Sequence, residues 1–468
     1  MPETCCVWFR RDLRVTDHPA LSAAVGRAER VVAVFCLDER LVSGANASGP
    51  RTQFMLECLA DLDRSLRDRG SRLIVRRGRP EREVVGLARA VGAGEIHFTR
   101  DATPYARARG RRVADACATA GIGLVGHPGL WTIDDPAELV SGAGTPYQVF
   151  TPFHHRWLAH PRRAVLDAPT GLGRPVGVDP GRLPSLGELG LESGVSRPVV
   201  GGERAAWERF DEFRADGVDR YARGGHDDLA VEGTSRLSAY LRFGCISPRQ
   251  VEAGLADGDG AEAFRRQLCW RDFYLDLIRR HPENAGLEQQ PGRRGIAWRD
   301  APEDLERWKL GRTGYPLVDA GMRQLMAEGF MHNRTRMVVG SFLTKHLGID
   351  WREGERWFMN LLVDGDPAVN NGNWQWIASV GSDPQPVGRR LLNPTRQQER
   401  FDPDGAYVRR WVPELRGVPN AHLAEPWRMP ADLALECGCV IGHDYPRPIV
   451  DHASARREAL ARYAGGAG

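Results

Sequence analysis

The chain has 468 residues, which is too long for one ordinary compact core, so two or more domains are expected. Hydrophobic residues make up 42% and charged residues 27%, a globular composition, and the net charge of +3 by itself says little about nucleic acid. No run of about 18 apolar residues is present, which argues against a membrane span. The N-terminus lacks the pattern of a secretory signal, and the nine scattered cysteines indicate reduced thiols in a cytosolic protein.

Short apolar runs alternate with helical stretches over the first third of the chain. They predict buried parallel strands at 7–9, 31–37, 73–75, 96–98 and 123–125, and helices at 20–27, 52–69, 80–91 and 106–120. This order predicts a right-handed βαβ series, and therefore an α/β domain with a doubly wound parallel sheet over residues 1–130. No G-x-G-x-x-G pattern follows the first strand, so a conventional dinucleotide site is not expected there.

The rest of the chain changes character after residue 130. Residues 131–202 are expected to connect two domains, because 168–202 is rich in Gly and Pro and lacks strong periodicity. From residue 203 to 468 the pattern predicts an all-helical domain. Val318, Met322 and Leu325 show the i, i+4, i+7 spacing of a helix that packs on a core.

Several ordered blocks resemble the DNA photolyase and cryptochrome family, and within it the class I cyclobutane pyrimidine dimer photolyases. The resemblance covers essentially the whole chain. It implies that the helical domain binds FAD and that the protein uses light to split pyrimidine dimers in DNA. The blocks are Val7-Trp-Phe-Arg-Arg-Asp-Leu-Arg14, Gly233-Thr-Ser-Arg-Leu-Ser238, Trp270-Arg-Asp-Phe-Tyr274, Gly314-Tyr-Pro-Leu-Val-Asp-Ala320, Met331-His-Asn-Arg334, Asp350-Trp-Arg-Glu-Gly354, Asp364-Gly-Asp366, Asn370-Asn-Gly-Asn-Trp-Gln-Trp376, Asn393-Pro394 and Trp411-Val-Pro-Glu-Leu415.

The resemblance assigns a phosphate-binding segment for FAD. A turn followed by a helix would direct hydroxyl and backbone N–H groups at a phosphate. By itself the T-S-x-L-S pattern is no more than a plausible helix N-cap, and Arg271 alone reads as a salt bridge on a helix. The implied FAD-binding residues in this part are Tyr221, Thr234, Ser235, Leu237, Ser238 and Arg271.

A second group matches the family positions around the flavin ring. Arg336 and Asp364 resemble a buried pair that flanks the ring, and Asp366 matches a further acceptor for the ring or ribose. Two close carboxylates could also suggest a metal, but D-x-D alone is a weak pattern and no metal is expected. Asn370 matches the residue facing flavin N5, where a neutral amide accepts from N5–H and favours reduced flavin.

Three tryptophans fall at the positions of the family's electron-transfer chain: Trp374, Trp351 and Trp298. A row of closely packed indoles passes an electron to excited, oxidised flavin in short hops. Taken singly, each of these tryptophans reads as a core residue.

The resemblance also implies a pocket for a dimer that leaves the duplex, as photolyases are among the enzymes that extrude their target base. Trp270 and Trp376 match its aromatic walls. Asn333 and Met337 match polar and apolar lesion contacts, and their i, i+4 spacing places them on one helix face, away from His332. The two expected phosphate contacts are Arg334 and Arg389.

Gln267 departs from the class I pattern, which usually has Glu three residues before the pocket tryptophan. Glutamine still hydrogen-bonds thymine edges but cannot donate a proton or hold a charge. We therefore expect a lower repair yield. Gln at this place also occurs in (6-4) photolyases and animal cryptochromes.

A second, antenna chromophore is implied for the α/β domain. Tyr105 and Arg109 lie in a segment that resembles the 8-hydroxy-deazaflavin-binding type more than the methenyltetrahydrofolate type. The alternatives are a folate antenna or no antenna, in which case the segment is a solvated helix start.

Two other functions stay open on the sequence: a cryptochrome-like photoreceptor, and repair of (6-4) lesions. Asn333 and Met337 oppose the second, since (6-4) enzymes have histidines at these two places. The first would be expected to carry a C-terminal extension, and the given chain stops at Gly468. The expected partner is DNA containing pyrimidine dimers, bound by a monomer.

Overall fold

Five apolar segments of the N-terminal third pair in parallel into one sheet with the strand order β3-β2-β1-β4-β5. The computed structural model describes residues 2–44, 47–173, 177–229, 233–383 and 385–465. All five predicted strands are present, each longer than its apolar centre. The strands are β1 (Thr4–Phe9), β2 (Arg30–Asp38), β3 (Leu73–Gly78), β4 (Glu95–Thr99) and β5 (Gly123–His127).

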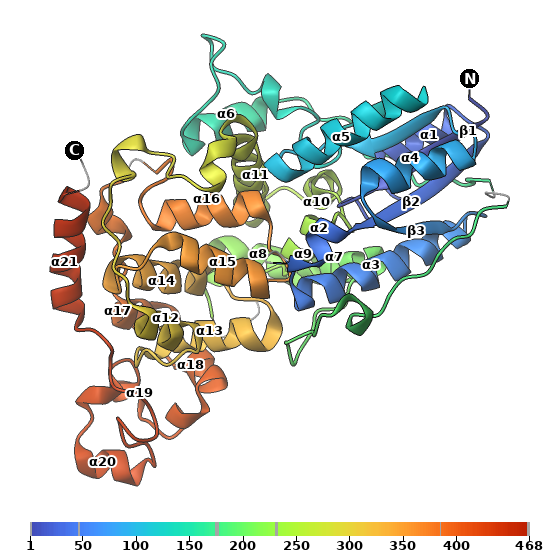
Figure 1. Cartoon of the computed structure of the whole chain (residues 1–468). Helices are drawn as coiled ribbons and strands as arrows, with labels where there is room; N and C mark the ends of the chain where they lie inside the picture. Colours follow the sequence, from blue (N-terminus) through green and yellow to red (C-terminus); the bar gives the residue numbers. More distant parts are fainter. Residues whose placement is uncertain (1, 45–46, 174–176, 230–232, 384, 466–468) are drawn as a thin grey trace.

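Helices cover both faces of this sheet, because successive side chains of each strand point to opposite faces. Cys5, Val7 and Phe9 face the helices α1 (Pro19–Val25) and α3 (Gly49–Arg67), whereas Cys6 and Trp8 face α4 (Pro80–Ala90) and α5 (Pro104–Ala120). A short helix, α2 (Glu39–Val42), follows β2. The predicted doubly wound α/β domain is confirmed (Figure 1).

The predicted connector contains one helix that the sequence pattern did not indicate, α6 (Phe150–Ala159). Beyond it the chain returns along the sheet: Val31 N donates to Leu172 O at 3.0 Å, and Val75 N donates to Pro180 O at 2.7 Å. These hydrogen bonds fix the connector on the α/β domain, so it is not a free linker.

The second half is helical, as predicted, and lies beside the α/β domain (Figure 1). Within the described ranges its only β pairing is an isolated bridge between Ile441 and Tyr445. The helices are α7 (Glu203–Glu212), α8 (Val218–Arg220), α9 (Ser238–Phe243), α10 (Pro248–Gly254), α11 (Asp259–Arg280), α12 (Pro302–Lys309), α13 (Pro316–Glu328), α14 (Asn333–Ser341), α15 (Trp351–Leu361), α16 (Pro367–Ile377), α17 (Pro394–Phe401), α18 (Ala406–Trp411), α19 (Asn420–Leu423), α20 (Ala431–Glu436) and α21 (His452–Gly465).

The α/β domain meets the helical part at the carboxyl ends of β1 and β4, where the strand order reverses. Such a switch point leaves a crevice outside the sheet. Here Leu13 N donates to Phe243 O at 3.0 Å and Arg14 Nη1 donates to Gly244 O at 3.0 Å. One hydrophobic cluster runs from β1 into α11, so the boundaries at 130 and 202 stay a prediction.

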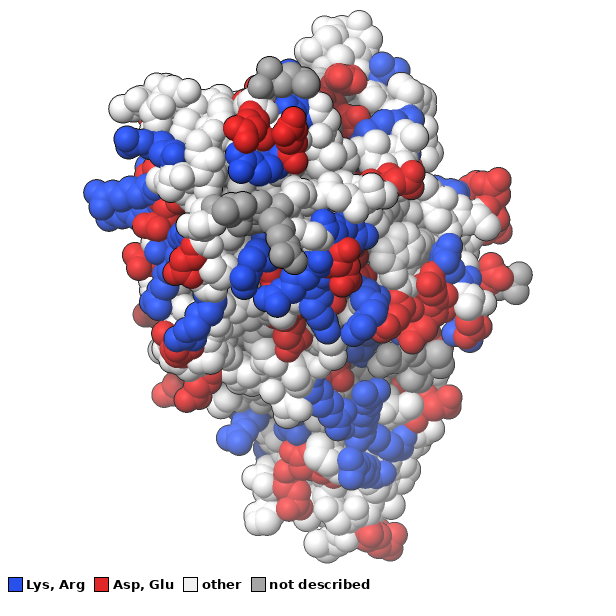
Figure 2. All heavy atoms as spheres, turned by 90° about the vertical axis from the view of Figure 1, so that its right-hand side faces the viewer, with Lys and Arg blue, Asp and Glu red and all other residues white. Residues whose placement is uncertain are grey.

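The surface carries charges of both signs. Figure 2 shows basic and acidic side chains interspersed over the face turned toward the viewer. None of the helices in the described ranges combines the length and the apolar composition needed to cross a membrane.

Candidate flavin and DNA site

The helix α16 packs directly on two other helices that carry predicted site residues, α11 and α14. The approach of α16 to α11 depends on Gly372, where a Cβ would lie 2.1 Å from Cδ1 of Tyr274. The approach of α14 to α16 depends in the same way on Gly340, which lies against Ile377 and Trp374. Residues distant in sequence are thus brought to one place by two glycines.

Trp270 is held in an aromatic stack. Its ring lies parallel to Phe150 of α6, with centroids 3.6 Å apart and an interplanar angle of 3°. Tyr274, one turn further along α11, stacks at 5.4 Å and 29°. Trp270 remains partly exposed, as a wall for a flipped base requires. No sequence pattern pairs Phe150 with Trp270, and only the fold brings the two rings together.

The ring of Trp376 is covered by Arg390, the residue that follows the predicted phosphate contact Arg389. The Arg390 guanidinium carbon lies 3.7 Å from the Trp376 ring centroid, and Arg390 pairs with Asp383. Arg389, the predicted phosphate contact, is exposed and donates to Gln385 Oε1 at 3.1 Å. The sequence shows the two adjacent arginines, but the turn of the chain decides which one stacks.

The N-terminal turn of α14 carries the two predicted lesion contacts. Asn333 is exposed at the first helical position, and Met337 is partly buried one turn later. His332 points elsewhere, as expected: its Nδ1 caps the helix by accepting from Arg334 N at 3.1 Å. The Arg334 side chain is bidentate on Asp227, with the closest contacts at 2.8 Å, so a phosphate would have to share or displace this carboxylate.

Gln267 is exposed one turn before Trp270 on α11. It therefore lies on the same side of the helix as the aromatic wall.

The predicted phosphate segment forms a turn that leads into α9. The carbonyl groups of Thr234 and Ser235 accept from Arg209 at 3.1 and 2.8 Å, which holds the turn against α7. Ser235 and Leu237 are buried, whereas the Ser238 side chain is exposed at the first residue of α9. The hydroxyl and N–H groups of such a turn suit a phosphate.

Tyr221 and Arg271 frame this segment in different ways. Tyr221 is buried and packs edge-on against Phe264 with centroids 5.4 Å apart. The Arg271 guanidinium donates to Leu130 O at 2.7 Å and Leu241 O at 3.4 Å, and so joins α11 to the chain beyond β5. The role of Arg271 in binding the FAD phosphates stays a prediction.

The two predicted carboxylates have different partners. Asp364 forms a bidentate pair with Arg336, at 2.8 and 3.3 Å. Asp366 caps α16 by accepting from Ala368 N at 2.9 Å, and its other oxygen pairs with Arg11 of the α/β domain. Burial alone would raise the pKa of Asp366, but nearby guanidinium groups, that of Arg11 foremost, hold it well below its ordinary value.

Asn370 presents an acceptor. Its Nδ2 donates to the Glu355 carbonyl at 3.0 Å, which leaves Oδ1 without a donor among the described residues. Asn371 Nδ2 donates to the Glu355 carboxylate at 3.1 Å, and burial raises the pKa of that carboxyl group to about 7. Glu355 was not singled out from the sequence, where an i to i+15 contact between two helices leaves no signal.

The tryptophans are buried to different degrees. Trp374 packs on Gly354 of α15, one turn after Trp351, and a Cβ at Gly354 would lie 2.1 Å from the indole. Trp351 is fully buried, and its Nε1 donates to Glu288 at 3.3 Å. Trp298 is partly exposed and meets Tyr463 edge-on at 6.2 Å. Two buried indoles and one that reaches the surface suit a path out of the core, and the order of the hops stays a prediction.

The predicted antenna residues converge on the end of β2. Tyr105 donates to the Asp38 carboxylate, Arg109 lies 3.9 Å from it, and the Arg109 guanidinium also covers Trp8 at 5.2 Å. Burial and the neighbouring carboxylate of Asp38 raise the pKa of Tyr105 to about 12, so its hydroxyl stays a donor. Ligands of α/β sheets bind at this carboxyl edge.

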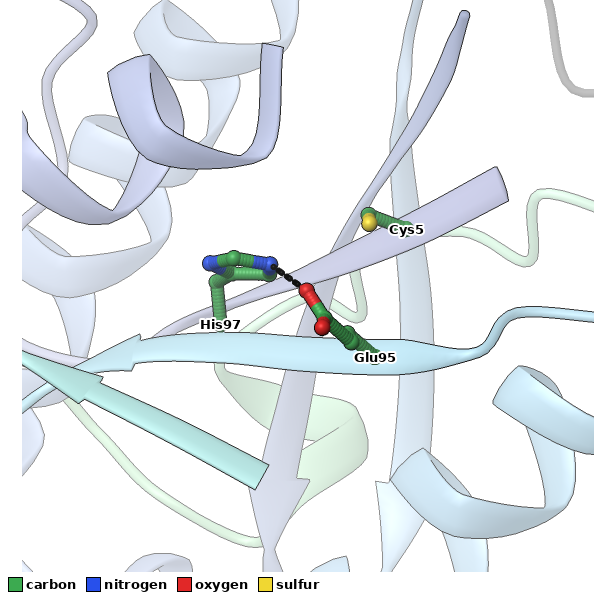
Figure 3. Close-up of side chains that lie close together, drawn as sticks. All are labelled: Cys5, Glu95 and His97. Atoms are coloured by element: carbon green, nitrogen blue, oxygen red, sulfur yellow. Dashed lines mark hydrogen bonds and ion pairs between the residues drawn. The ribbon is translucent and has the colours of Figure 1, made fainter. Parts of the chain in front are cut away.

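One cluster outside these sites has metal-ligand residue types: Cys5 of β1 with Glu95 and His97 of β4 (Figure 3). Glu95 is paired with Arg27 at 2.6 Å, and His97 lies 3.1 Å from Glu95 and 2.9 Å from His127. We interpret Glu95, His97 and His127 as a hydrogen-bonded network that joins β4 to β5, with Cys5 of β1 beside it.

Comparisons with known proteins match this arrangement along the whole chain. The family described as "DNA photolyase" matches residues 5–170, and that described as "FAD binding domain of DNA photolyase" matches residues 264–465. A Streptomyces griseus protein named deoxyribodipyrimidine photo-lyase is 43% identical over 456 residues, which cover 96% of this chain and 97% of that protein.

Solved structures give the same result. A class III photolyase from Agrobacterium tumefaciens superposes with a TM-score of 0.91 at 35% identity, covering 100% of this chain and 98% of the other. An archaeal photolyase from Sulfolobus tokodaii, described with two FAD molecules, superposes with a TM-score of 0.84 at 32% identity, covering 99% and 100%. With its sheet domain, its helical FAD-binding domain and full-length relatives above 30% identity, this chain belongs to the DNA photolyase family.

Proposed function

We propose that this protein is a deoxyribodipyrimidine photo-lyase, which repairs cyclobutane pyrimidine dimers in DNA by light-driven electron transfer from FAD. The observation that carries the proposal is the junction of α11, α14 and α16. There α16, which carries Asn370 and the partly exposed Trp376, packs on α11, which carries the partly exposed Trp270, and on α14, which carries Asn333.

The residues present fit FAD. The turn at Thr234 and Ser235 offers phosphate donors, the Arg336–Asp364 pair offers charge beside a ring, and Asn370 offers a free amide oxygen. When bound, FAD supplies the electron that opens the dimer and takes it back. The protein binds FAD and the dimer, orients them toward each other and excludes water. No side chain has to act as a nucleophile.

The lesion is bound by stacking and hydrogen bonds. The Trp270 wall is fixed by Phe150 and so offers a prepared surface, which lowers the ordering cost of binding. Gln267 and Asn333 supply amide groups for thymine edges, and Met337 supplies an apolar contact. Arg389 and Arg334 contact phosphate groups of the DNA backbone.

We place a second chromophore at the carboxyl edge of the sheet, beside Tyr105, Arg109 and Asp38. A planar ring system with polar edges matches this set of an aromatic, a cation and a carboxylate, and we favour 8-hydroxy-deazaflavin over folate. We further propose that the protein acts as a monomer in the cytosol and that it is of class I.

The test is repair under blue light. The purified protein is photoreduced and mixed with an oligonucleotide containing one cyclobutane dimer, and recovery of thymine absorbance is followed against a dark control. Recovery in the light only supports the proposal. A flavin-loaded protein that is photoreduced yet restores no thymine overturns it, and then a photoreceptor or (6-4) enzyme, both compatible with Gln267, takes its place.

A further inference from the structure

A pocket of about 660 Å³ lies at the edge of the helical part, between two elements that are neighbours in sequence and a third that follows much later in the chain. They are the single-turn helix η9 (Val387–Arg390), the start of α17 and the first turns of α21. Its lining consists of Gly388, Leu391, Asn393, Arg396, His452, Ala453, Arg456, Arg457 and Leu460.

The charge of this pocket has one sign. Arg396 comes from α17, and Arg456 and Arg457 come from α21, while no carboxylate lines the pocket. In the part of the chain that the structure describes, none of these three guanidinium groups forms an ion pair; Arg457 only donates to Ser454 Oγ, at 3.0 Å. Three cations that face one hollow with no carboxylate in its lining leave it electropositive.

The neighbouring titratable groups leave most of this charge in place. His452 Nδ1 lies 2.9 Å from His346 Nε2, and burial lowers the pKa of both rings, that of His346 to about 3. The adjacent Asp451 accepts from Ser454 N at 2.8 Å and lies close enough to Arg457 for that guanidinium to help lower its pKa, but it is exposed and does not line the pocket. The two imidazoles are neutral near pH 7, and the three arginines set the charge.

The position of the pocket points to its ligand. Gly388 lines the pocket. It is followed in the sequence by Arg389, the predicted phosphate contact, and by Arg390, which stacks on Trp376. This turn is rigid, because Arg390 O accepts from Ser341 Oγ at 2.9 Å and from the buried Lys345 Nζ at 3.1 Å. The pocket and the proposed lesion wall are therefore connected through one short turn, which contributes Gly388 to the first and Arg390 to the second.

We propose that this pocket binds a backbone phosphate of the DNA strand that flanks the flipped dimer, through Arg396, Arg456 and Arg457. The inference rests on the proposed DNA repair function and extends its DNA contacts to α21. Guanidinium groups suit the oxygens of a phosphodiester, and such contacts fix register without reading sequence. The same chemistry would accept free inorganic phosphate, so the test separates the two sources.

The main variant is Arg456→Gln with Arg457→Gln. Both side chains are exposed, so the fold should persist, which retained flavin absorbance verifies. The matched control is Arg182→Gln with Arg204→Gln, which removes the same charge from two exposed arginines outside the proposed DNA site. A single Arg396→Gln variant approaches the pocket from α17.

Dissociation constants are measured for dimer-containing and undamaged duplexes at several salt concentrations. Each lost phosphate contact lowers the slope of log K against log salt by about 0.9. The pocket holds one phosphate, so the double variant loses one such contact, and the affinity ratio of wild type to double variant falls about 3.5-fold between about 50 mM and about 200 mM salt. The Arg396→Gln variant loses at most the same slope of about 0.9, since it contacts the same phosphate, and the control keeps the wild-type slope.

Inorganic phosphate is titrated in parallel at constant ionic strength, with the melting temperature as readout. A loss of slope in the pocket variants alone, on both duplexes, supports the proposal. Unchanged slopes overturn it, and a phosphate-dependent rise in melting temperature that the double variant loses would then assign the pocket to a free anion. An equal loss in the control also overturns it. Wild-type repair under light is scored separately, so a failure of the proposed function is distinguishable.

Discussion

Replacing Gly372 with alanine tests whether the contact between α16 and α11 positions the site. The added methyl would lie 2.1 Å from Tyr274 Cδ1, 2.6 Å from Cε1 and 2.7 Å from Cγ. Ordinary carbon–carbon contacts begin at about 3.5 Å, so the two groups must separate by roughly 1.4 Å. The Tyr274 ring is buried and packed against Trp270 and Phe273, so it has little room to swing away.

The helix α16 must therefore shift, and it carries Asn370 and Trp374 on either side of the glycine. We expect a loss of about 1–3 kcal/mol in the free energy of unfolding, as for other overpacked cores. Since a misplacement of about 1 Å can cost about a hundredfold in rate, repair per bound flavin should fall by up to that factor.

The assay compares repair rates at equal flavin occupancy, together with urea unfolding midpoints. The matched control is Gly86→Ala in α4, where nothing lies within 4 Å of the new methyl. That change should stabilise the protein by up to about 1 kcal/mol through helix propensity and leave repair unchanged. If Gly372→Ala retains wild-type stability and repair, the argument that this close approach positions the site is wrong.

Three further predictions concern the flavin and its surroundings. Gln267→Glu should raise the ratio of ring splitting to unproductive back electron transfer about fivefold, the equivalent of one hydrogen bond worth roughly 1 kcal/mol, and should thereby raise the quantum yield of dimer repair; an unchanged yield would remove Gln267 from the mechanism. Trp374→Phe should slow photoreduction, followed by flavin absorbance, at least about tenfold, a barrier increase of about 1.4 kcal/mol, while chemically reduced enzyme still repairs; normal photoreduction would refute the electron path. Because burial raises the pKa of Glu355 to about 7, it favours the protonated form in the folded state. The stability that this group contributes is present below about pH 4.5 and is lost as pH rises through 7, by at most about 3 kcal/mol. Glu355→Gln should abolish that loss, which urea unfolding between about pH 5 and 8 measures. An unchanged pH profile of the unfolding free energy would contradict the raised pKa of Glu355.

The sequence by itself determined the fold class and the family of this protein. Apolar runs of strand length between helical stretches predict the five parallel strands, since strand and helix periodicities are local properties. The motif blocks predict the family and its flavin, because they are read in order along the chain. The predicted side of α14 also holds, since helix geometry alone separates His332 from Asn333 and Met337.

Only the tertiary structure decided which side chains complete the site. Phe150 comes from a connector without periodicity and stacks on Trp270 more than a hundred residues later. Arg390 stacks on Trp376 although Arg389 is the residue predicted for DNA, and Arg334 proves to be paired with Asp227. The direction of a side chain after a turn depends on the whole packing around it, which no local pattern encodes.

The same reason holds for the groups that join the two domains. Arg11 pairs with Asp366 across the interface between the two domains. The three arginines of the electropositive pocket come from α17 and α21, which are separated in sequence by α18, α19 and α20. Local periodicity fixes which face of an element is apolar, whereas charge pairs form wherever distant faces meet. The elements and the family are therefore legible in the sequence, and the positions of its arginines are set by the way those elements pack.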